Sequence, residues 1–318
     1  MLTRSKAVMP SSFTFALIPV PPFALEYTAW ALRRRPQNLV DIWENGTYRR
    51  VVRLEGGPAE IQVRQQGGRE AARLEVGVIG ENLRSTAKAE VARLLTRMLG
   101  LEADLRAFYR IAASDAKLGA LAERYRGLKP VRFPTIFEAL ANAIACQQFT
   151  LAAGLNLLGE LAHLGGVWIR TTSGVHYGFP EPADLLRLPV RTFRSIGFSR
   201  QKTNAFRELA RGVLRGDCDI EGLDAVDNEP AMESLLELRG IGRWSAEYVL
   251  LRGLGRLDIF PADDVGARNG LGLWLGRRRP MDSEGVLRAV RRWRPYAGLV
   301  YFHLLLESLR AAGKLHME

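Results

Sequence analysis

The pattern of hydrophobic and polar positions changes near Leu101. Before this point, apolar residues alternate with polar residues over short runs, and a period of two predicts β-strands. The predicted strands cover residues 13–17, 47–54, 60–66 and 72–78, with glycine-containing turns between the last three. After Leu101 the strand signals stop and apolar residues recur every three or four positions, which predicts helices.

The first part of the chain is predicted to form a small α+β domain over residues 10–100, preceded by a disordered start at residues 1–10. Its strands predict an antiparallel meander with one buried face and one wet face, on which the strand arginines are expected to lie. A helix is expected over residues 23–32, and another ends at Gly100. The apolar stripe of this second helix, expected to cover the buried face of the sheet, consists of Val91, Leu94, Leu95 and Met98.

The second part, residues 101–318, is predicted to be an all-α bundle. Pro134 is expected in the first turn of one of its helices. The glycine- and threonine-rich segment 165–180 is predicted to be a mobile surface loop. The predicted helices cover residues 101–113, 116–126, 135–147, 150–163, 182–188, 191–196, 200–215, 230–239, 244–254, 264–275, 283–293 and 296–312.

The amino-acid composition indicates what kind of partner the protein binds. The 318 residues carry a net charge of +11, which favours a polyanion, most commonly nucleic acid, although an arginine-rich proteome gives the same excess. Cys146 and Cys218 form no CxxC pair, zinc set or iron–sulfur set, and the four histidines share no motif. No metal site is therefore predicted.

The start of the chain has weak features of a secretion signal. Arg4 and Lys6 precede an apolar patch, but Pro19, Pro21 and Pro22 interrupt it and no clean cleavage site follows. No stretch approaches the roughly 18 apolar residues of a membrane span. We therefore expect a cytoplasmic protein.

The stretch from Leu235 to Asp264 contains the most informative local pattern. Gly240-Ile241-Gly242 separates two apolar-periodic segments, which predicts two short helices joined by a tight turn. Glycine permits a positive φ and leaves no Cβ, so the free N–H groups around Gly242 to Ser245 can approach a phosphate. Arg243 can add its charge. The same short pattern occurs in simple helical corners, so the turn alone is a weak signal.

The longer pattern resembles the helix-hairpin-helix DNA glycosylases, which flip a damaged base out of the duplex and cut its glycosidic bond. Within this family, the sequence is most similar to the branch of 3-methyladenine DNA glycosylase II, the AlkA type. The matching residues are Gly240-Ile241-Gly242-Arg243-Trp244, Ser245-Ala246, Tyr248, Leu251-Arg252-Gly253 and Pro261-Ala262-Asp263-Asp264.

The resemblance extends upstream and covers most of the chain. Residues 137–148, the segment 196–198 with Lys202, and Leu209-Ala210 are similar to the helices that precede the hairpin in this family. The N-terminal unit suits the small TATA-binding-protein-like domain of this branch. The hairpin is expected at about residues 230–254.

The resemblance implies that Asp264 is the catalytic carboxylate. An Asp-Asp pair ahead of a helix is most often an N-cap, but in the family the aspartate at this place, 22 residues after Gly242, faces the flipped nucleotide. An anion at a helix N-terminus is favourable. It can stabilise the positive charge that builds on the sugar, and it can orient the attacking water. Asp263 is then expected to be the cap.

Trp244 bears on the type of reaction. In bifunctional members a lysine at this place attacks the sugar and forms a Schiff base, which tryptophan cannot do. The resemblance therefore implies a monofunctional enzyme that leaves an abasic site and does not nick the strand. Trp244 and Tyr248 lie four residues apart, a spacing that core packing also produces. By resemblance they line the base pocket and stack on an electron-poor, often cationic, alkylated purine.

Three further features follow from the resemblance. Gln147 and Gln148 end a helix as two exposed amides, and Gln148 occupies the place of the side chain that fills the gap left by the flipped base. Some relatives have a second tryptophan on the last helix, where this sequence has Tyr301 and no tryptophan, so the substrate range is left open. Backbone carbonyls of the hairpin hold a monovalent cation in DNA-bound relatives; no other cofactor is expected.

A basic cluster after the hairpin matches either phosphate contacts or a solvated face. Its residues are Arg277, Arg278, Arg279, Arg288, Arg291, Arg292 and Arg294.

Together these observations predict a monomeric, nucleoid-associated base excision repair enzyme of bacterial type. It is expected to be a hydrolase of N-glycosyl bonds that releases alkylated purines of the 3-methyladenine and 7-methylguanine type from double-stranded DNA. Two alternatives remain at this point. One is a non-catalytic helix-hairpin-helix protein that only binds DNA, and the other is a bifunctional glycosylase/lyase.

Overall fold

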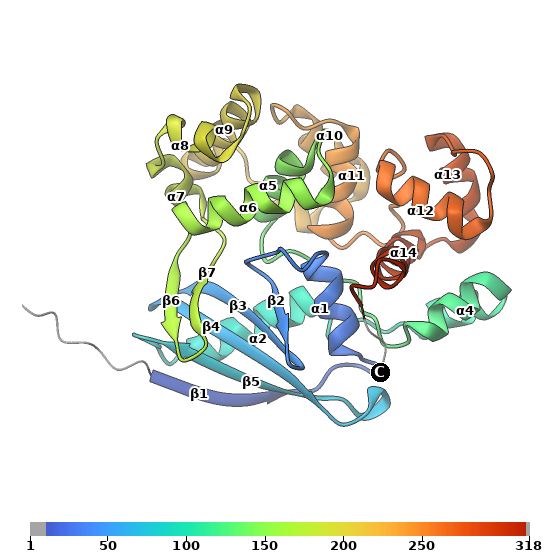
Figure 1. Ribbon diagram of the computed structural model, residues 1–318, viewed down its shortest axis with the longest axis horizontal. Helices are drawn as coiled ribbons and strands as arrows, with labels where there is room; N and C mark the ends of the chain where they lie inside the picture. Colours follow the sequence, from blue (N-terminus) through green and yellow to red (C-terminus); the bar gives the residue numbers. More distant parts are fainter. Residues whose placement is uncertain (1–10, 316–318) are drawn as a thin grey trace, which may run out of the picture.

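The computed structural model describes residues 11–315; the predicted disordered start at residues 1–10 lies outside the described residues. Figure 1 shows two lobes, with a β-sheet in the lower lobe and a group of helices in the upper one. The elements of the first part of the chain are β1 (Ser11–Leu17), α1 (Leu25–Arg33), β2 (Ile42–Glu44), β3 (Thr47–Leu54), β4 (Gly57–Gln66), β5 (Arg73–Gly80) and α2 (Ala87–Leu99).

The sheet has five antiparallel strands in the order β1-β5-β4-β3-β2. Strands β2 to β5 follow the chain as the predicted meander, and β1 pairs with β5 at the other edge, where Ser11 lies opposite Gly80. The four predicted strands are confirmed. The three-residue strand β2 was not predicted, because a run this short has no measurable period.

One face of the sheet packs on helices. Tyr48, Val63 and Val76 lie opposite one another on neighbouring strands and are fully buried. They share a hydrophobic core with α2, which contributes Val91, Leu95 and Met98. Gly100 ends α2 with a φ of 59°, as expected of a left-handed C-terminal glycine.

The prediction that the strand arginines form a solvated face holds for Arg64 and Arg73, which are exposed, and is wrong for Arg50 and Arg53. Arg50 lies on the core face and is 3% exposed; it pairs with Asp41 at 2.7 Å and with Glu138 of the helical part. Arg53, on the other face, pairs with Glu181 at 2.9 Å. The carboxylates that neutralise these arginines come from distant parts of the chain, so the local pattern of the strands does not reveal them.

All the predicted helices of the second part are present, and most ends agree within three residues. They are α3 (Arg106–Ala113), α4 (Ala116–Arg124), α5 (Ile136–Cys146), α6 (Leu151–Gly165), α7 (Pro182–Arg187), α8 (Val190–Ile196), α9 (Arg200–Arg215), α10 (Asn228–Glu237), α11 (Arg243–Arg252), α12 (Val265–Leu275), α13 (Ser283–Val290) and α14 (Ala297–Ala311). Pro134 lies outside α5, contrary to expectation, because Thr135 caps this helix by accepting a hydrogen bond from the Glu138 N–H.

The segment predicted as a mobile loop is a β-hairpin. Strands β6 (Trp168–Thr171) and β7 (Gly174–Tyr177) pair antiparallel. Figure 1 shows them descending from the helical lobe across the sheet. Gly178 bridges to Val51 of β3, and His176 contacts the buried carboxylate of Glu60. The hairpin therefore covers the sheet face that was expected to be wet, and its partner residues lie more than 100 positions away.

The described residues form two hydrophobic cores. One joins the sheet and helices α1 to α4 with α12 to α14, so the end of the chain packs on its beginning. The other lies within α5 to α11. Residues 101–315 therefore contribute to both cores, and the predicted division into domains at residues 10–100 and 101–318 stays a prediction.

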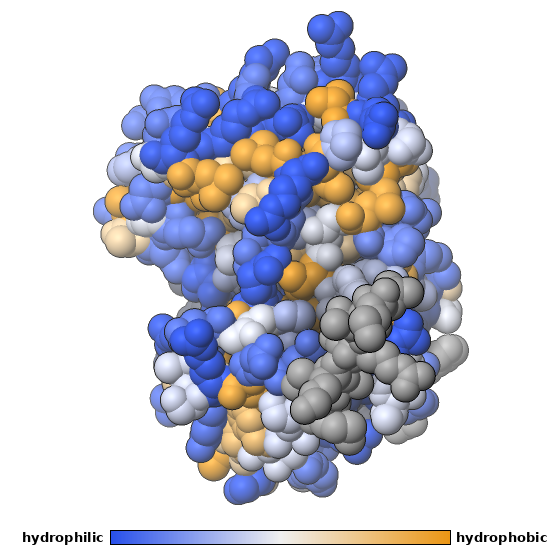
Figure 2. Space-filling model, turned by 90° about the vertical axis from the view of Figure 1, so that its left-hand side faces the viewer, coloured by the Kyte–Doolittle hydropathy of each residue, from blue (hydrophilic) through white to orange (hydrophobic). Residues whose placement is uncertain are grey.

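Figure 2 shows the molecule from the left-hand side of Figure 1, where hydrophobic side chains gather mainly on the upper, helical part of the face. Across residues 11–315, no helix combines the length and hydrophobicity that crossing a bilayer requires.

Candidate functional site

The glycine turn joins α10 to α11 as the sequence predicts, but its two glycines differ. Gly240 has a φ of 82°, in the region that favours glycine. Gly242 is the N-cap of α11 with a φ of −102° and a ψ of 178°, an extended conformation that any residue adopts. A Cβ on Gly242 would meet nothing within 4 Å. The feature that Gly242 provides is open space in front of the helix.

The first turn of α11 is open to a ligand. The N–H groups of residues 243–245 have no carbonyl partner within the helix, and no described side chain caps it. The side chain of Arg243 is 68% exposed and donates to Glu247 at 3.0 Å. Ser245, at 1% exposure, is buried, so its contact with the DNA backbone stays a prediction.

Gln147 holds this turn in place. Its side-chain amide donates to the Gly240 carbonyl at 2.7 Å and to the Ser245 hydroxyl at 2.9 Å. The expectation of two exposed amides at the end of α5 is therefore wrong for Gln147, which is half-buried, and right for Gln148. Gln147 therefore fixes the hairpin turn to the end of α5. The sequence did not predict this role, because a glutamine at a helix end is ordinarily exposed.

Asp264, and not Asp263, caps α12. Asp264 Oδ1 accepts a 2.8 Å hydrogen bond from the Ala267 N–H, while the exposed Asp263 accepts one from the Ser283 hydroxyl. The expectation that Asp263 is the cap is wrong, because the N-cap is the residue directly before the helix and only its side chain reaches the third N–H. Capping fixes one oxygen of Asp264 and leaves the other available.

The second oxygen of Asp264 faces aromatic side chains. Oδ2 accepts a hydrogen bond from the Trp244 indole N–H at 3.3 Å and one from the Tyr301 hydroxyl at 3.4 Å. Burial and the nearby negative charge of Asp264 raise the pKa of Tyr301 well above its ordinary value, so this hydroxyl stays a donor. The structure thus brings the predicted Asp264 and Trp244 together with Tyr301.

Tyr248 lies beneath Trp244. The two ring centroids are 5.6 Å apart and Tyr248 is 4% exposed. Its hydroxyl accepts a 2.8 Å hydrogen bond from Arg34, and the guanidinium of Arg252 lies 5.7 Å from its ring centroid. The partly exposed aromatic surfaces beside Asp264 therefore belong to Trp244 and Tyr301. The base-pocket role of Tyr248 stays a prediction.

Sequence reasoning missed Arg34 as a site residue and did not assign Tyr301. Arg34 follows α1 with a φ of 62° and also donates to Asn142 of α5 at 2.6 Å. Nothing in its neighbourhood signals this, because adjacent arginines after a helix ordinarily lie on the surface. Tyr301 has a signal, since it lies on the last helix, where some relatives have a second tryptophan.

The loop between α5 and α6 presents two exposed side chains, Gln148 and Phe149. Gln148 has a φ of 58°, and Phe149 is 46% exposed. Lys202 supports the loop from α9: its ammonium donates to the carbonyls of Ala145 and Gln147 and lies 4.0 Å from the Phe149 ring centroid. Phe149 is thus an exposed aromatic residue next to Gln148 that the sequence analysis did not single out. The gap-filling role of Gln148 stays a prediction.

No cluster of three or more histidine, cysteine, aspartate or glutamate side chains suited to a metal occurs in the described part of the chain. The monovalent cation expected at the hairpin would use backbone carbonyls. One carbonyl of the turn, that of Gly240, already accepts from Gln147. The cation stays a prediction.

Comparison with known proteins identifies both parts of the chain. Residues 141–295 match the model of the HhH-GPD superfamily base excision DNA repair protein, and residues 14–138 match the AlkA N-terminal domain. A solved 3-methyladenine DNA glycosylase from Archaeoglobus fulgidus superposes with a TM-score of 0.79 at 27% identity, covering 92% of this chain and 97% of that one. The predicted two-part fold is confirmed.

Two curated relatives are also named as 3-methyladenine glycosylases. The DNA-3-methyladenine glycosylase of Bacillus subtilis is 27% identical over 217 residues, covering 68% of this chain and 72% of the relative. The DNA-3-methyladenine glycosylase 2 of Escherichia coli is 29% identical over 194 residues, covering 60% and 64%.

Proposed function

Because this chain belongs to the HhH-GPD superfamily of base excision DNA repair proteins, as a DNA glycosylase related to the 3-methyladenine glycosylases, we propose that it releases alkylated purines from double-stranded DNA by monofunctional hydrolysis. The observation that carries the proposal is the Asp264 carboxylate. One of its oxygens is fixed by helix capping and the other faces Trp244 and Tyr301, beside an uncapped helix start.

The proposed chemistry uses Asp264 as a fixed negative charge. When the bond between C1′ of the sugar and the purine nitrogen breaks, its electron pair leaves with the purine, and a cationic alkylated purine departs as a neutral base. Positive charge then develops on the sugar, and a preorganised carboxylate stabilises it. The oxygen of a water molecule bonds to C1′, and the proton of that water passes to Asp264 or to solvent.

The aromatic groups supply recognition. Trp244 and Tyr301 are partly exposed next to Asp264 Oδ2 and suit stacking on an extruded purine. A cationic lesion strengthens such stacking through the negative face of the rings. Because this base is already a good leaving group, the site needs recognition more than a strong general acid. The lesions proposed are of the 3-methyladenine and 7-methylguanine type.

The monofunctional assignment rests on Trp244 in the place of the Schiff-base lysine. Lys202, the lysine that contacts the loop before α6, has its ammonium engaged by two carbonyls, and burial lowers its pKa. Treatment with borohydride during turnover should trap no covalent enzyme–DNA adduct. A strongly trapped band would instead identify a bifunctional glycosylase/lyase.

The decisive test replaces Asp264 by Asn. Asparagine caps helices as well as aspartate, so Asp264→Asn should fold normally, bind abasic-site duplex and lose release of 3-methyladenine by about a hundredfold or more. Asp263→Asn is the matched control, since it removes the same charge one residue away. Equal activity of Asp264→Asn and wild type would remove the proposed role, and a duplex panel with one lesion each would define the substrate range.

We also propose that the enzyme acts as a monomer in the cytoplasm, on nucleoid DNA. A monovalent cation at the hairpin carbonyls completes the proposal. Its test is the dependence of abasic-duplex affinity on potassium against a larger organic cation at equal ionic strength.

A further inference from the structure

We propose that the loop between α12 and α13 is a second DNA-backbone site, which binds phosphates within about five nucleotides of the flipped base. This inference rests on the proposed function, since it assumes that a duplex lies at Asp264. It adds a contact that neither the hairpin turn nor the loop before α6 provides. Its role would be to extend the footprint on the flanking duplex.

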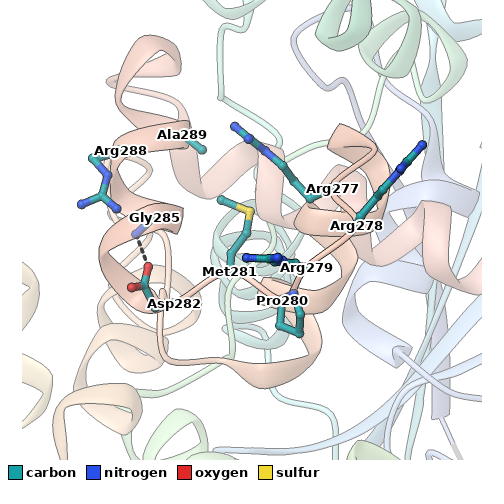
Figure 3. Close-up of a pocket in the computed structure, with 9 residues that line it drawn as sticks. All are labelled: Arg277, Arg278, Arg279, Pro280, Met281, Asp282, Gly285, Arg288 and Ala289. Atoms are coloured by element: carbon teal, nitrogen blue, oxygen red, sulfur yellow. Dashed lines mark hydrogen bonds between the residues drawn. The ribbon is translucent and has the colours of Figure 1, made fainter.

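The loop forms an open, basic groove. It is about 810 Å³ in volume, and its lining includes Arg277, Arg278, Arg279, Met281 and Arg288. Figure 3 shows the guanidinium groups of Arg277 and Arg278 extending away from the loop, with Arg279 lying beside Met281 and Arg288 on the opposite side. An open groove of this size accommodates a backbone that passes through it.

The positive charge of the groove is largely uncompensated. Among the described residues, Arg277, Arg278 and Arg279 form no ion pair with a carboxylate, whereas Arg288 pairs with Glu284 at 3.2 Å. The one carboxylate in the lining, Asp282, caps α13 by accepting a 2.7 Å hydrogen bond from the Gly285 N–H. By contrast, Arg50 and Arg53 each have carboxylate partners. A cluster of mutually repelling cations is relieved by a polyanion.

The groove has a fixed position relative to the candidate active site. Helix α12 begins directly after Asp264 and has 11 residues, so it spans about 16 Å at 1.5 Å per residue. Phosphates along one DNA strand are about 3.4 Å apart along the helix axis. Whatever its direction relative to the duplex, α12 therefore separates the loop from the catalytic position by at most roughly five nucleotides along the duplex axis. Figure 1 shows α12 and α13 together at one end of the helical lobe.

The base of the loop is anchored. Gly276 ends α12 with a φ of 76°, and the Lys117 ammonium donates to the carbonyls of Trp274 and Leu275 at 3.4 and 3.1 Å. This anchoring ties the end of α12 to α4 and limits the loss of conformational entropy on binding. The arginines project from a supported turn and are not on a free tail.

A duplex fits these observations better than an anionic bilayer does. The groove directly follows the helix that begins at Asp264, so one straight duplex can reach both. A bilayer surface would instead favour an amphipathic helix with an apolar face beside the basic residues. The groove is formed by a short turn with one half-buried thioether and four guanidinium groups.

The test removes the three loop arginines as Arg277→Gln, Arg278→Gln and Arg279→Gln in one protein. The matched control is Arg73→Gln, Arg93→Gln and Arg110→Gln, which removes the same charge from exposed positions in β5, α2 and α3. Thermal unfolding is measured first for both proteins. Affinity for a 20-base-pair duplex with a central abasic site is then measured over a series of salt concentrations.

We expect the loop variant to bind at least about fivefold more weakly at low salt, and the control to stay within about twofold. The slope of log K against log salt should fall by about 0.9 for each phosphate that the loop no longer neutralises. Two further duplexes are each shortened to three base pairs on one side of the lesion. With one of them, wild type and the loop variant should bind equally.

Three outcomes would overturn the inference. They are equal affinity and slope for the loop variant and wild type, an equal loss in the control, and a loss of binding to phosphatidylserine vesicles with DNA binding unchanged. Base release at saturating enzyme should be unchanged in the loop variant. If the wild type binds duplex through the loop but releases no base, the proposed function fails and this inference stands.

Discussion

Arg34 donates a 2.8 Å hydrogen bond to the hydroxyl of Tyr248, although 214 positions separate the two residues. Arg34 follows the first helix of the N-terminal part, and Tyr248 is on the second helix of the hairpin. Tyr248 in turn lies under Trp244, with 5.6 Å between the ring centroids. The N-terminal part of the chain therefore contributes directly to the support of the candidate base pocket.

Replacing Arg34 by Met should weaken catalysis more than it weakens DNA binding. A hydrogen bond from a charged donor contributes about 1.5 kcal/mol, which corresponds to about a tenfold loss of kcat/KM if the Tyr248–Trp244 pair loses its position. The measurement is base release together with affinity for undamaged duplex. Arg35→Met is the control, because the described contacts of Arg35 do not include site residues. Equal effects of both changes would argue against this role.

The two glycines of the turn should separate folding from DNA binding. Gly242→Ala should leave the free energy of unfolding within about 1 kcal/mol of wild type, because the φ is ordinary and the space is open. Its methyl group should crowd a bound phosphate and weaken affinity for abasic duplex. Gly240→Ala should instead destabilise the fold by about 1–2 kcal/mol, because its φ is 82°. Chemical unfolding and duplex titration check both, and an unchanged affinity of Gly242→Ala would count against the hairpin assignment.

Phe149 and Gln148 can be compared as the side chains that fill the gap in the duplex. Both are exposed, so replacement of either by Ala should change stability by no more than about 0.5 kcal/mol. Stacking of an aromatic side chain on a base contributes about 1–3 kcal/mol. We therefore expect Phe149→Ala to weaken abasic-duplex affinity by about fivefold or more, and Gln148→Ala to weaken it less. The reverse order would assign the role to Gln148 alone.

Because of His303, we expect the folded protein to lose stability in mild acid. It is fully buried, its Nε2 has no partner in the described structure, and burial lowers its pKa from 6.5 to about 4. Between these values the unfolded chain binds more protons than the folded one, so stability is complete above pH 6.5 and falls as the pH drops toward 4. From pH 7 to pH 5 the expected loss from this group is about 2 kcal/mol. Urea unfolding at both pH values should show a smaller loss in His303→Gln than in wild type.

Local patterns predicted most of the fold. The strands from β3 to β5, helix α2 up to Gly100 and the hairpin helices follow from periodicity and from glycine positions. Two features did not. The pairing of Arg50 with Asp41 and Glu138 and the docking of β7 on β3 both depend on partners far away in the chain. Local periodicity carries no information about such partners.

The candidate site also combines residues that the local sequence pattern predicted with residues that it did not predict. The residues between Gly240 and Asp264 are close in sequence, and their pattern indicated both the turn and the carboxylate. Tyr301, Phe149 and Arg34 reach the site from α14, from the loop before α6 and from the end of α1. Phe149 and Arg34 are ordinary residues in their local sequence, and only the family resemblance draws attention to Tyr301. Only the packing of these three elements around α11 and α12 gives them a role.

The β6–β7 hairpin has a consequence for how the protein can be divided. It covers one face of the sheet with residues from the helical part, and α14 packs on α1 at the start of the chain. A fragment cut at residue 100 would lose the contact of His176 with Glu60 and of Glu138 with Arg50, and the remainder would lack Arg34. The two parts should therefore unfold in a single transition, and neither should be recovered as a stable fragment after limited proteolysis.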